Sequence, residues 1–80
     1  MIAEEKPLIP YKYVRCKLCG RLFKSVEYSH LIHKHGITIE EYERMFPYSP
    51  RISIETLRKL GRYKEAEEIE KRFKFGLLDL

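Results

Sequence analysis

The sequence predicts a small α+β domain in which two short strands precede several helices. Residues 11–16 alternate between two faces and are rich in residues that favour strands. From residue 38 onward, apolar residues instead recur at the spacing of one helical face. Cysteines and histidines with the spacing of metal ligands lie from the end of the first region to just before the second. A core built from 80 residues gives only marginal stability, so a bound metal ion is the expected source of the rest.

The first strand is predicted to turn into a second short strand over residues 21–24. Gly20 can supply the positive φ that such a turn often needs. Ser25 is predicted to cap a helix that runs through His30 to about His35, and Gly36 fits the position just past the end of that helix. The side chains that can close a small core here are Phe23, Val26, Leu31 and Ile37.

Two capped helical segments are predicted to follow. Thr38 and Glu41 have the spacing of a capping box, and Pro47 ends the helix that they begin. The apolar face of that helix is predicted from Ile39, Tyr42, Met45 and Phe46. After a tight linker over residues 47–50, Ser53 can cap a third helix. The apolar stripe of this third helix comprises Ile54, Leu57 and Leu60.

Gly61 leaves two interpretations of the remaining chain open. Residues 60–66 are similar to the turn between the helices of a tetratricopeptide unit, which predicts a helical hairpin. The alternative is one long helix that tolerates Gly61 at a cost of about 1 kcal/mol. In both interpretations Ala66, Ile69 and Phe73 continue an apolar stripe, and residues 75–80 form an apolar tail.

The two cysteines are better suited to binding a metal than to pairing with each other. Two residues separate Cys16 from Cys19, so a disulfide would close a very small loop and constrain little. The same spacing on a turn lets both thiolates point at one zinc ion, which takes four sulfur or nitrogen ligands in a tetrahedron. A labile local disulfide or a redox switch is the alternative.

Spacing selects two of the three histidines as the other ligands. His30 and His33 have two residues between them, fewer than the three to five that are usual in such sites. His33 and His35 lie about 200° apart on a regular helix and cannot share a metal. His30 and His35 have four residues between them, which fits if the helix loosens before Gly36. The sequence therefore predicts a Zn²⁺ site made by Cys16, Cys19, His30 and His35, with His33 as a surface side chain.

These elements together predict a ββα zinc finger followed by two or three α-helices, in three parts. Residues 1–10 are expected to form an irregular arm, because Pro7 and Pro10 oppose both a helix and a central strand. Residues 11–47 comprise the finger with its appended helix. Residues 48–80 form a helical segment that packs on the same domain.

The net charge of +4 is concentrated on the finger. Between residues 11 and 35, six basic side chains are opposed by Glu27 alone. A positive field of this kind is expected where a protein binds nucleic acid, and a solvated basic face is the plain alternative. Tyr28 lies near the helix start, from which a finger reads bases. The predicted DNA-contacting side chains are Lys12, Arg15, Lys17, Arg21, Lys24, Tyr28 and Lys34.

Composition bears on the setting in which the protein works. No apolar run is long enough for a signal peptide or a membrane helix, which predicts a soluble cytoplasmic protein without a membrane partner. Asn and Gln are absent while Lys, Arg, Glu and Ile are abundant, which is the trend of hyperthermophile proteins. A hot archaeal host, or the host cell of an archaeal virus, is the favoured origin, with chance in a short chain as the alternative.

Part of the sequence resembles the Ros/MucR group of prokaryotic zinc-finger regulators and the single-finger proteins of archaeal viruses. The resemblance covers Cys16 to Phe46. It is carried by Cys16-x2-Cys19, Phe23-Lys24-Ser25, His30-Leu31, His35-Gly36 and Thr38-x-Glu40-Glu41-Tyr42. It implies a ββα finger extended by a second helix that packs on it, acting as a DNA-binding transcription regulator. It also independently selects His30 and His35 as the histidine pair.

The function predicted from charge and resemblance is binding of double-stranded DNA by a transcription regulator. A lone finger reads about three base pairs, so the site needs a homodimer through the C-terminal helices or further basic side chains. The candidates for such further contacts are Arg51, Arg58, Lys59 and Arg62. The competing class is a zinc-stabilised protein-interaction module without direct DNA binding. An enzyme with a small-molecule substrate is not expected, because a closed four-ligand zinc leaves no position for a reacting water.

Overall fold

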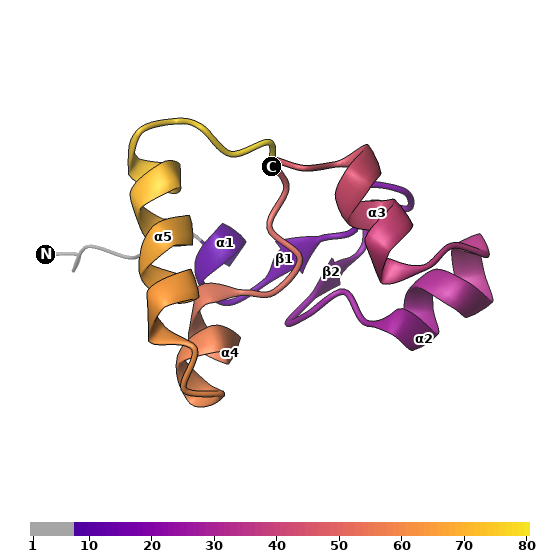
Figure 1. Ribbon diagram of the computed structural model, residues 1–80, viewed down its shortest axis with the longest axis horizontal. Coiled ribbons are helices and arrows are strands. Elements are labelled where there is room, and N and C mark those ends of the chain that lie inside the picture. The colour runs from indigo at the N-terminus through magenta and orange to yellow at the C-terminus, as the bar shows by residue number, and fades with distance from the viewer. Residues whose placement is uncertain (1–7) are drawn as a thin grey trace, which may run out of the picture.

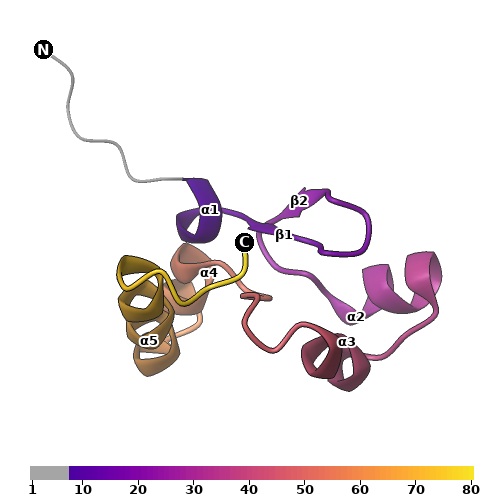
Figure 2. The same cartoon turned by 90° about the horizontal axis from the view of Figure 1, so that it is seen from above.

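The computed structural model describes residues 8–80 as a two-stranded sheet with helices on both sides (Figure 1). The elements, in chain order, are α1 (Leu8–Tyr11), β1 (Val14–Arg15), β2 (Leu22–Phe23), α2 (Tyr28–His30), η1 (Leu31–His35), α3 (Ile39–Met45), α4 (Ile54–Lys59) and α5 (Tyr63–Lys74). Both views place α2 and α3 on one side of the strands and α1, α4 and α5 on the other (Figures 1 and 2). The predicted α+β class is confirmed.

The antiparallel strands are shorter than predicted. Val14 pairs with Phe23 and Arg15 with Leu22. Beyond Arg15 the chain enters a tight turn, in which the Gly20 amide donates to the Cys16 carbonyl at 2.7 Å. Gly20 has a φ of 78°, so the predicted positive φ is confirmed.

The described end of the predicted irregular arm has an irregular backbone. Residues 1–7, including Pro7, lie outside the described part of the chain. Leu8–Tyr11 forms a short helical segment, kinked at Ile9 and Pro10. The Leu8 carbonyl accepts from both the Lys12 and Tyr13 amides at 2.8 Å. Ile9 and Pro10 themselves have non-helical dihedral angles, and Pro10 is buried.

Ser25 does not cap the next helix, which begins three residues later at Tyr28 and has Glu27 at its N-cap. Ser25 instead forms an antiparallel bridge with Ile52. The Val26 amide donates to the Arg51 carbonyl at 2.8 Å, and the Ser53 amide donates to the Lys24 carbonyl at 3.0 Å. The backbone N–H and C=O groups around Ser25 therefore find their hydrogen-bond partners in residues 51–53 and not in a helix cap.

Helix α3 begins at the predicted capping box and ends before Pro47. The Thr38 hydroxyl accepts from the Glu41 amide at 3.1 Å, and the Glu41 carboxylate accepts from the Thr38 amide at 3.0 Å. Tyr42 on this helix is fully buried. Met45, predicted on the same apolar face, is the last residue of the helix and is 53% exposed, which contradicts that prediction, whereas Ile39 and Phe46 pack against the first core.

The last part of the chain is a helical hairpin, so the single-helix alternative is wrong. Ser53 caps α4 through a bond from the Thr56 amide, as predicted. Gly61 separates α4 from α5 with a φ of 78°, a conformation that ends a helix at little cost only for glycine. Leu60 lies at this turn and is 61% exposed, which contradicts its predicted place in the apolar stripe.

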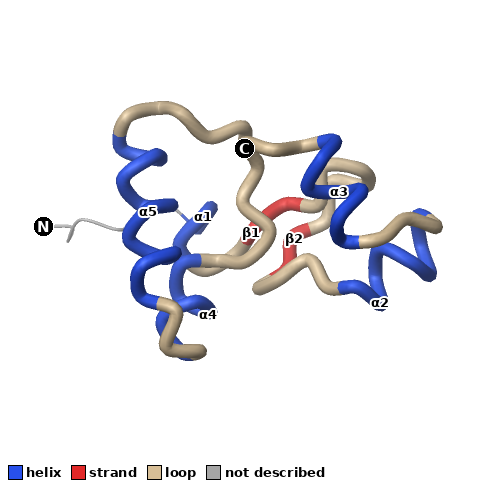
Figure 3. The backbone as a smooth tube through the Cα atoms, viewed as in Figure 1, coloured by secondary structure: helices blue, strands red, loops and turns tan. Residues whose placement is uncertain are grey.

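The structure has two small apolar cores joined through residues 24–26 and 51–53. The first contains the buried side chains of Val14, Cys16, Val26, Leu31 and Tyr42, with the predicted Phe23 and Ile37 packed against them. The second contains those of Ile52, Ile54, Leu57 and Ala66. Arg51 bridges the cores, because its guanidinium donates to the Val26 carbonyl at 2.8 Å. Figure 3 shows the loop and turn segments on which this junction depends.

Candidate metal centre

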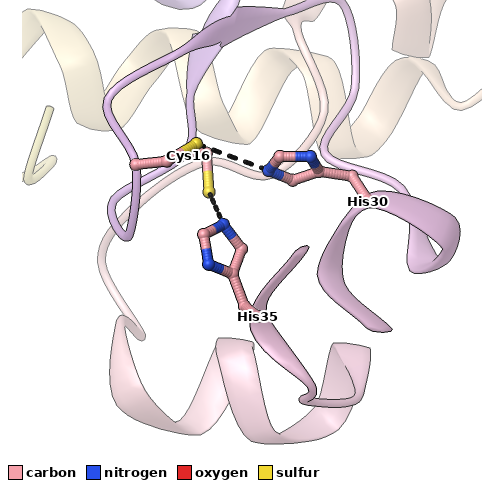
Figure 4. Close-up of side chains that lie close together, drawn as sticks. Cys16, His30 and His35 are labelled. Atoms are coloured by element: carbon pink, nitrogen blue, oxygen red, sulfur yellow. Dashed lines mark hydrogen bonds between the residues drawn. The ribbon is translucent and has the colours of Figure 1, made fainter. Parts of the chain in front are cut away.

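Four side chains from three neighbouring segments converge on one point. Cys16 follows β1, Cys19 lies in the turn, His30 ends α2 and His35 ends η1. One ligand atom from each of these residues lies within 4.8 Å of the other three. The Cys16 Sγ and His35 Nε2 atoms are 3.7 Å apart, and the Cys19 Sγ and His30 Nε2 atoms are 3.5 Å apart. Figure 4 shows both imidazole rings directed at the sulfur atoms.

The two sulfur–nitrogen separations match edges of a zinc tetrahedron. Zn–S bonds of about 2.3 Å and Zn–N bonds of about 2.0–2.1 Å place sulfur and nitrogen ligands about 3.6 Å apart. The two sulfur–nitrogen distances bracket that value. The donor set of two thiolates and two imidazoles is also one that zinc binds in structural sites. The residues present therefore fit this metal.

The unusual helix before Gly36 explains how the two histidines meet. Residues five positions apart on an α-helix lie about 140° apart around its axis. Leu31–His35 is instead a π-helix, whose hydrogen bonds join residues five apart and so stack them on one face. The His30 and His35 ring centroids are consequently 4.9 Å apart. Gly36 ends this turn with a φ of 68°, as its predicted place required.

His33 lies outside the group of candidate ligands. It is exposed on η1, and the group contains the other two histidines. The predicted choice of His35 over His33 therefore agrees with the geometry. The expected loosening of the helix takes the specific form of a π-turn.

The surroundings shift the pKa values of two candidate ligands in opposite directions. Burial raises the pKa of the Cys16 thiol, so without a metal this group is held in its protonated form at neutral pH. Burial, together with the charges of His35, Arg21 and Lys34, lowers the pKa of His30. The lowered pKa favours the neutral imidazole that a metal requires.

Sequence reasoning missed the support that α3 gives to the turn that carries Cys16 and Cys19, called the metal-binding turn below because it holds two of the candidate ligands. The Lys17 amide, between the two cysteines, donates to the Tyr42 hydroxyl at 3.0 Å. The sequence predicts Tyr42 only as an apolar contact. Its hydroxyl could have indicated a polar contact as well, since a buried tyrosine usually places its O–H against a polar partner. On the other side of the site, the Phe23 ring lies 4.5 Å from the His30 ring.

The structure separates the predicted DNA-contacting side chains into three sets. Arg21 and Lys34 line a cavity beside Cys19, His30 and His35. Lys12, Arg15 and Lys24 are exposed, and Tyr28 is 52% exposed at the start of α2. Lys17 differs from the rest, because its ammonium is 3.0 Å from the Asp79 carboxylate.

The fold and the four convergent side chains define a small α+β protein with a two-cysteine, two-histidine group that can hold a metal ion. Comparisons with protein-family models, curated proteins and solved structures found no match for the chain. No helix within residues 8–80 has the length and apolar character needed to cross a membrane.

Proposed function

We propose that this chain is a zinc-finger protein that binds double-stranded DNA and regulates transcription, as its Ros/MucR-like motifs imply. In this proposal Zn²⁺ is bound by Cys16, Cys19, His30 and His35, and β1, β2 and the α2–η1 segment form a ββα finger. The convergence of the four ligand atoms supports the zinc site. The metal has a structural role, since four protein ligands leave no position for a reacting water.

The observation that carries DNA binding is the distribution of paired and unpaired cations. On the finger, five exposed basic side chains have no carboxylate partner within residues 8–80: Lys12, Arg15, Arg21, Lys24 and Lys34. On and before the hairpin, Arg51, Arg58, Arg62 and Arg72 each pair with a glutamate. The exposed lysines of the hairpin are in none of these pairs, but five glutamates lie among them in residues 53–75, whereas Glu27 is the one acidic residue between residues 11 and 35. Cations that no carboxylate neutralises are available to phosphates, although the Arg15 guanidinium also donates to the Gly20 carbonyl at 3.0 Å. The finger side, with few acidic side chains, is therefore the favourable surface.

This distribution changes which side chains are expected to extend the surface. Arg51, Arg58 and Arg62 were candidates for further DNA contacts, but Glu43, Glu70 and Glu65 respectively neutralise them. Arg51 also donates to the Val26 carbonyl. We therefore assign these three arginines to holding the fold together. Lys59 is exposed and is in none of these pairs.

The start of α2 is the segment proposed to read bases. In ββα fingers the helix start enters the major groove and its exposed side chains reach base edges. Glu27, Tyr28 and Ser29 are all exposed there. A carboxylate such as Glu27 can accept from the cytosine amino group in the major groove. The surrounding lysines and arginines contact phosphate, which contributes affinity without sequence information.

The test is DNA affinity as a function of salt concentration, measured with the zinc-loaded protein. Each phosphate contact contributes about −0.9 to the slope of log K against log salt, so five contacts predict a slope of about −4.5. Arg21→Glu and Lys24→Glu should each weaken binding and flatten the slope by about one unit. Lys64→Glu is the matched control, because it makes the same charge change on the exposed face of α5. An equal loss with Lys64→Glu, or no binding by the unaltered protein, would contradict the proposal.

A second function is favoured by one observation on the hairpin side. Large apolar side chains are exposed there, with Leu60 at 61%, Tyr63 at 66%, Phe75 at 71% and Leu77 at 61%. Exposed apolar groups of this size suit a protein interface, including one between two copies of this chain. A protein-interaction or dimerisation module would self-associate in sedimentation experiments and would show flat or absent salt-dependent DNA binding.

A further inference from the structure

The C-terminal segment, residues 75–80, crosses back from α5 to the finger. In both views its end lies beside the linker that follows α3 (Figures 1 and 2). The Asp79 amide donates to the Tyr48 carbonyl at 2.8 Å, and the Ser49 hydroxyl donates to the Asp79 carbonyl at 2.7 Å. These two hydrogen bonds to the main chain of Asp79 fix it beside the 47–50 linker.

The side chain of the docked Asp79 meets the metal-binding turn. Its carboxylate Oδ1 lies 3.0 Å from the ammonium of Lys17, which stands between the two cysteines. The side chain of Lys17 is only 22% exposed, whereas that of Asp79 is 61% exposed. Lys17 cannot easily leave this contact by moving its backbone, because its amide is bonded to the buried Tyr42 hydroxyl.

Lys17 is thereby the exception among the basic side chains of the finger. The five others described above have no carboxylate partner within residues 8–80, and Lys17 has one that comes from 62 positions away. A carboxylate and a phosphodiester are both singly charged oxygen acceptors for a lysine ammonium. The two groups therefore compete for the same donor.

We propose that the C-terminal segment is an internal competitor of nucleic acid: Asp79 occupies Lys17 in the free protein, and a backbone phosphate must displace it on binding. This inference rests on the proposed DNA-binding function. It assigns the segment a regulatory role, because anything that lifts residues 75–80 from the linker makes one more cation available to DNA. Segment docking and DNA binding are then reciprocally linked.

The experiment compares Asp79→Asn with Glu68→Gln in the full zinc-loaded chain. Each substitution removes one negative charge and releases one cation, since Glu68 pairs with Arg72 on α5 at 2.9 Å. Both substitutions therefore have the same general electrostatic effect, and only Asp79→Asn frees Lys17. The probe is a fluorescein-labelled DNA duplex of mixed sequence. Each variant is also made in a Lys17→Ala background.

Asp79→Asn should bind the duplex about two- to fivefold more tightly than Glu68→Gln, which is the range expected for losing one exposed ion pair. The excess should vanish in the Lys17→Ala background. Independently of DNA, acylation of the Lys17 amine, followed by mass spectrometry, should be faster in Asp79→Asn than in Glu68→Gln.

Three results would overturn the inference, and they are distinguishable. Equal duplex affinities of the two variants would refute the competition while leaving DNA binding intact. Equal acylation of Lys17 would show that Asp79 does not cover it. Absence of DNA binding in every protein, with Lys17 acylation still faster in Asp79→Asn, would refute the proposed function and, with it, the competition.

Discussion

Replacing Tyr42 with phenylalanine tests whether α3 holds the metal-binding turn. The substitution removes one hydroxyl and keeps the ring, which is buried in the first core and lies 5.2 Å from the Phe46 ring. The Lys17 amide then loses the acceptor that it reaches at 3.0 Å. Because this amide lies between Cys16 and Cys19, we expect the substitution to make the positions of the two thiolates less well fixed.

The size of the effect follows from the single hydrogen bond that is lost. A typical intramolecular hydrogen bond contributes about 0.5–1.5 kcal/mol net, and a donor left without a partner costs about 1–3 kcal/mol. Lys17 is half-buried, so water can partly replace the hydroxyl and the lower range applies. When folding and zinc binding are coupled, the lost free energy appears as lost metal affinity. We expect zinc affinity to fall about two- to tenfold.

The assay is competition for zinc against a chelator of known affinity, with thermal unfolding of the zinc-loaded protein as the second readout. Tyr63→Phe is the matched control, because it removes the same hydroxyl from a side chain that is 66% exposed. Zinc affinity and melting temperature should be unchanged in this control. If Tyr42→Phe bound zinc as tightly as Tyr63→Phe, the proposed support of the turn by α3 would be refuted.

Three further predictions concern the metal centre. Removal of zinc with a chelator should unfold at least residues 13–36, since the metal contributes about 10 kcal/mol or more, and amide NMR spectra that kept their native dispersion there would contradict this. His35→Ala should weaken zinc binding by at least about a hundredfold, beyond the cost of losing an outer-shell partner, whereas His33→Ala should leave a zinc titration unchanged. Because burial raises the pKa of Cys16, zinc binding at about pH 7 should release its proton, and apparent affinity should fall as the pH is lowered. Calorimetry in buffers of different ionisation enthalpy measures that release, and a pH-independent affinity would refute it.

Local signals predicted the helix boundaries well where the interactions are themselves local. The Thr38–Glu41 capping box, the Ser53 cap and the helix-ending Gly36 each involve residues a few positions apart. These patterns depend on little beyond their own sequence. Ser25 failed as a predicted cap because its segment pairs with residues 51–53, and nothing in the neighbouring sequence encodes that partner.

The arrangement of the four candidate metal ligands was predictable because ligand spacing constrains geometry strongly. The interval between His30 and His35 suits an α-helix poorly, so the spacing itself required a local change of helix type. The π-turn over Leu31–His35 is that change. The hydroxyl contact of Tyr42 was not predictable in the same way, because which face of α3 meets the metal-binding turn depends on how two separate elements pack.

Which basic side chains are available to a phosphate was the least predictable feature, as Lys17 shows. By sequence alone it is one of several similar cations on the finger, and Arg51, Arg58 and Arg62 form another set of the same kind. Whether a cation is available to a phosphate depends on whether a carboxylate already neutralises it, and the partners of Lys17 and Arg58 are 62 and 12 positions away. Net charge by segment therefore indicates which side of the molecule is basic. The tertiary pairing decides which cations can bind DNA without first losing an internal partner, and this is why Lys17 separates from its neighbours.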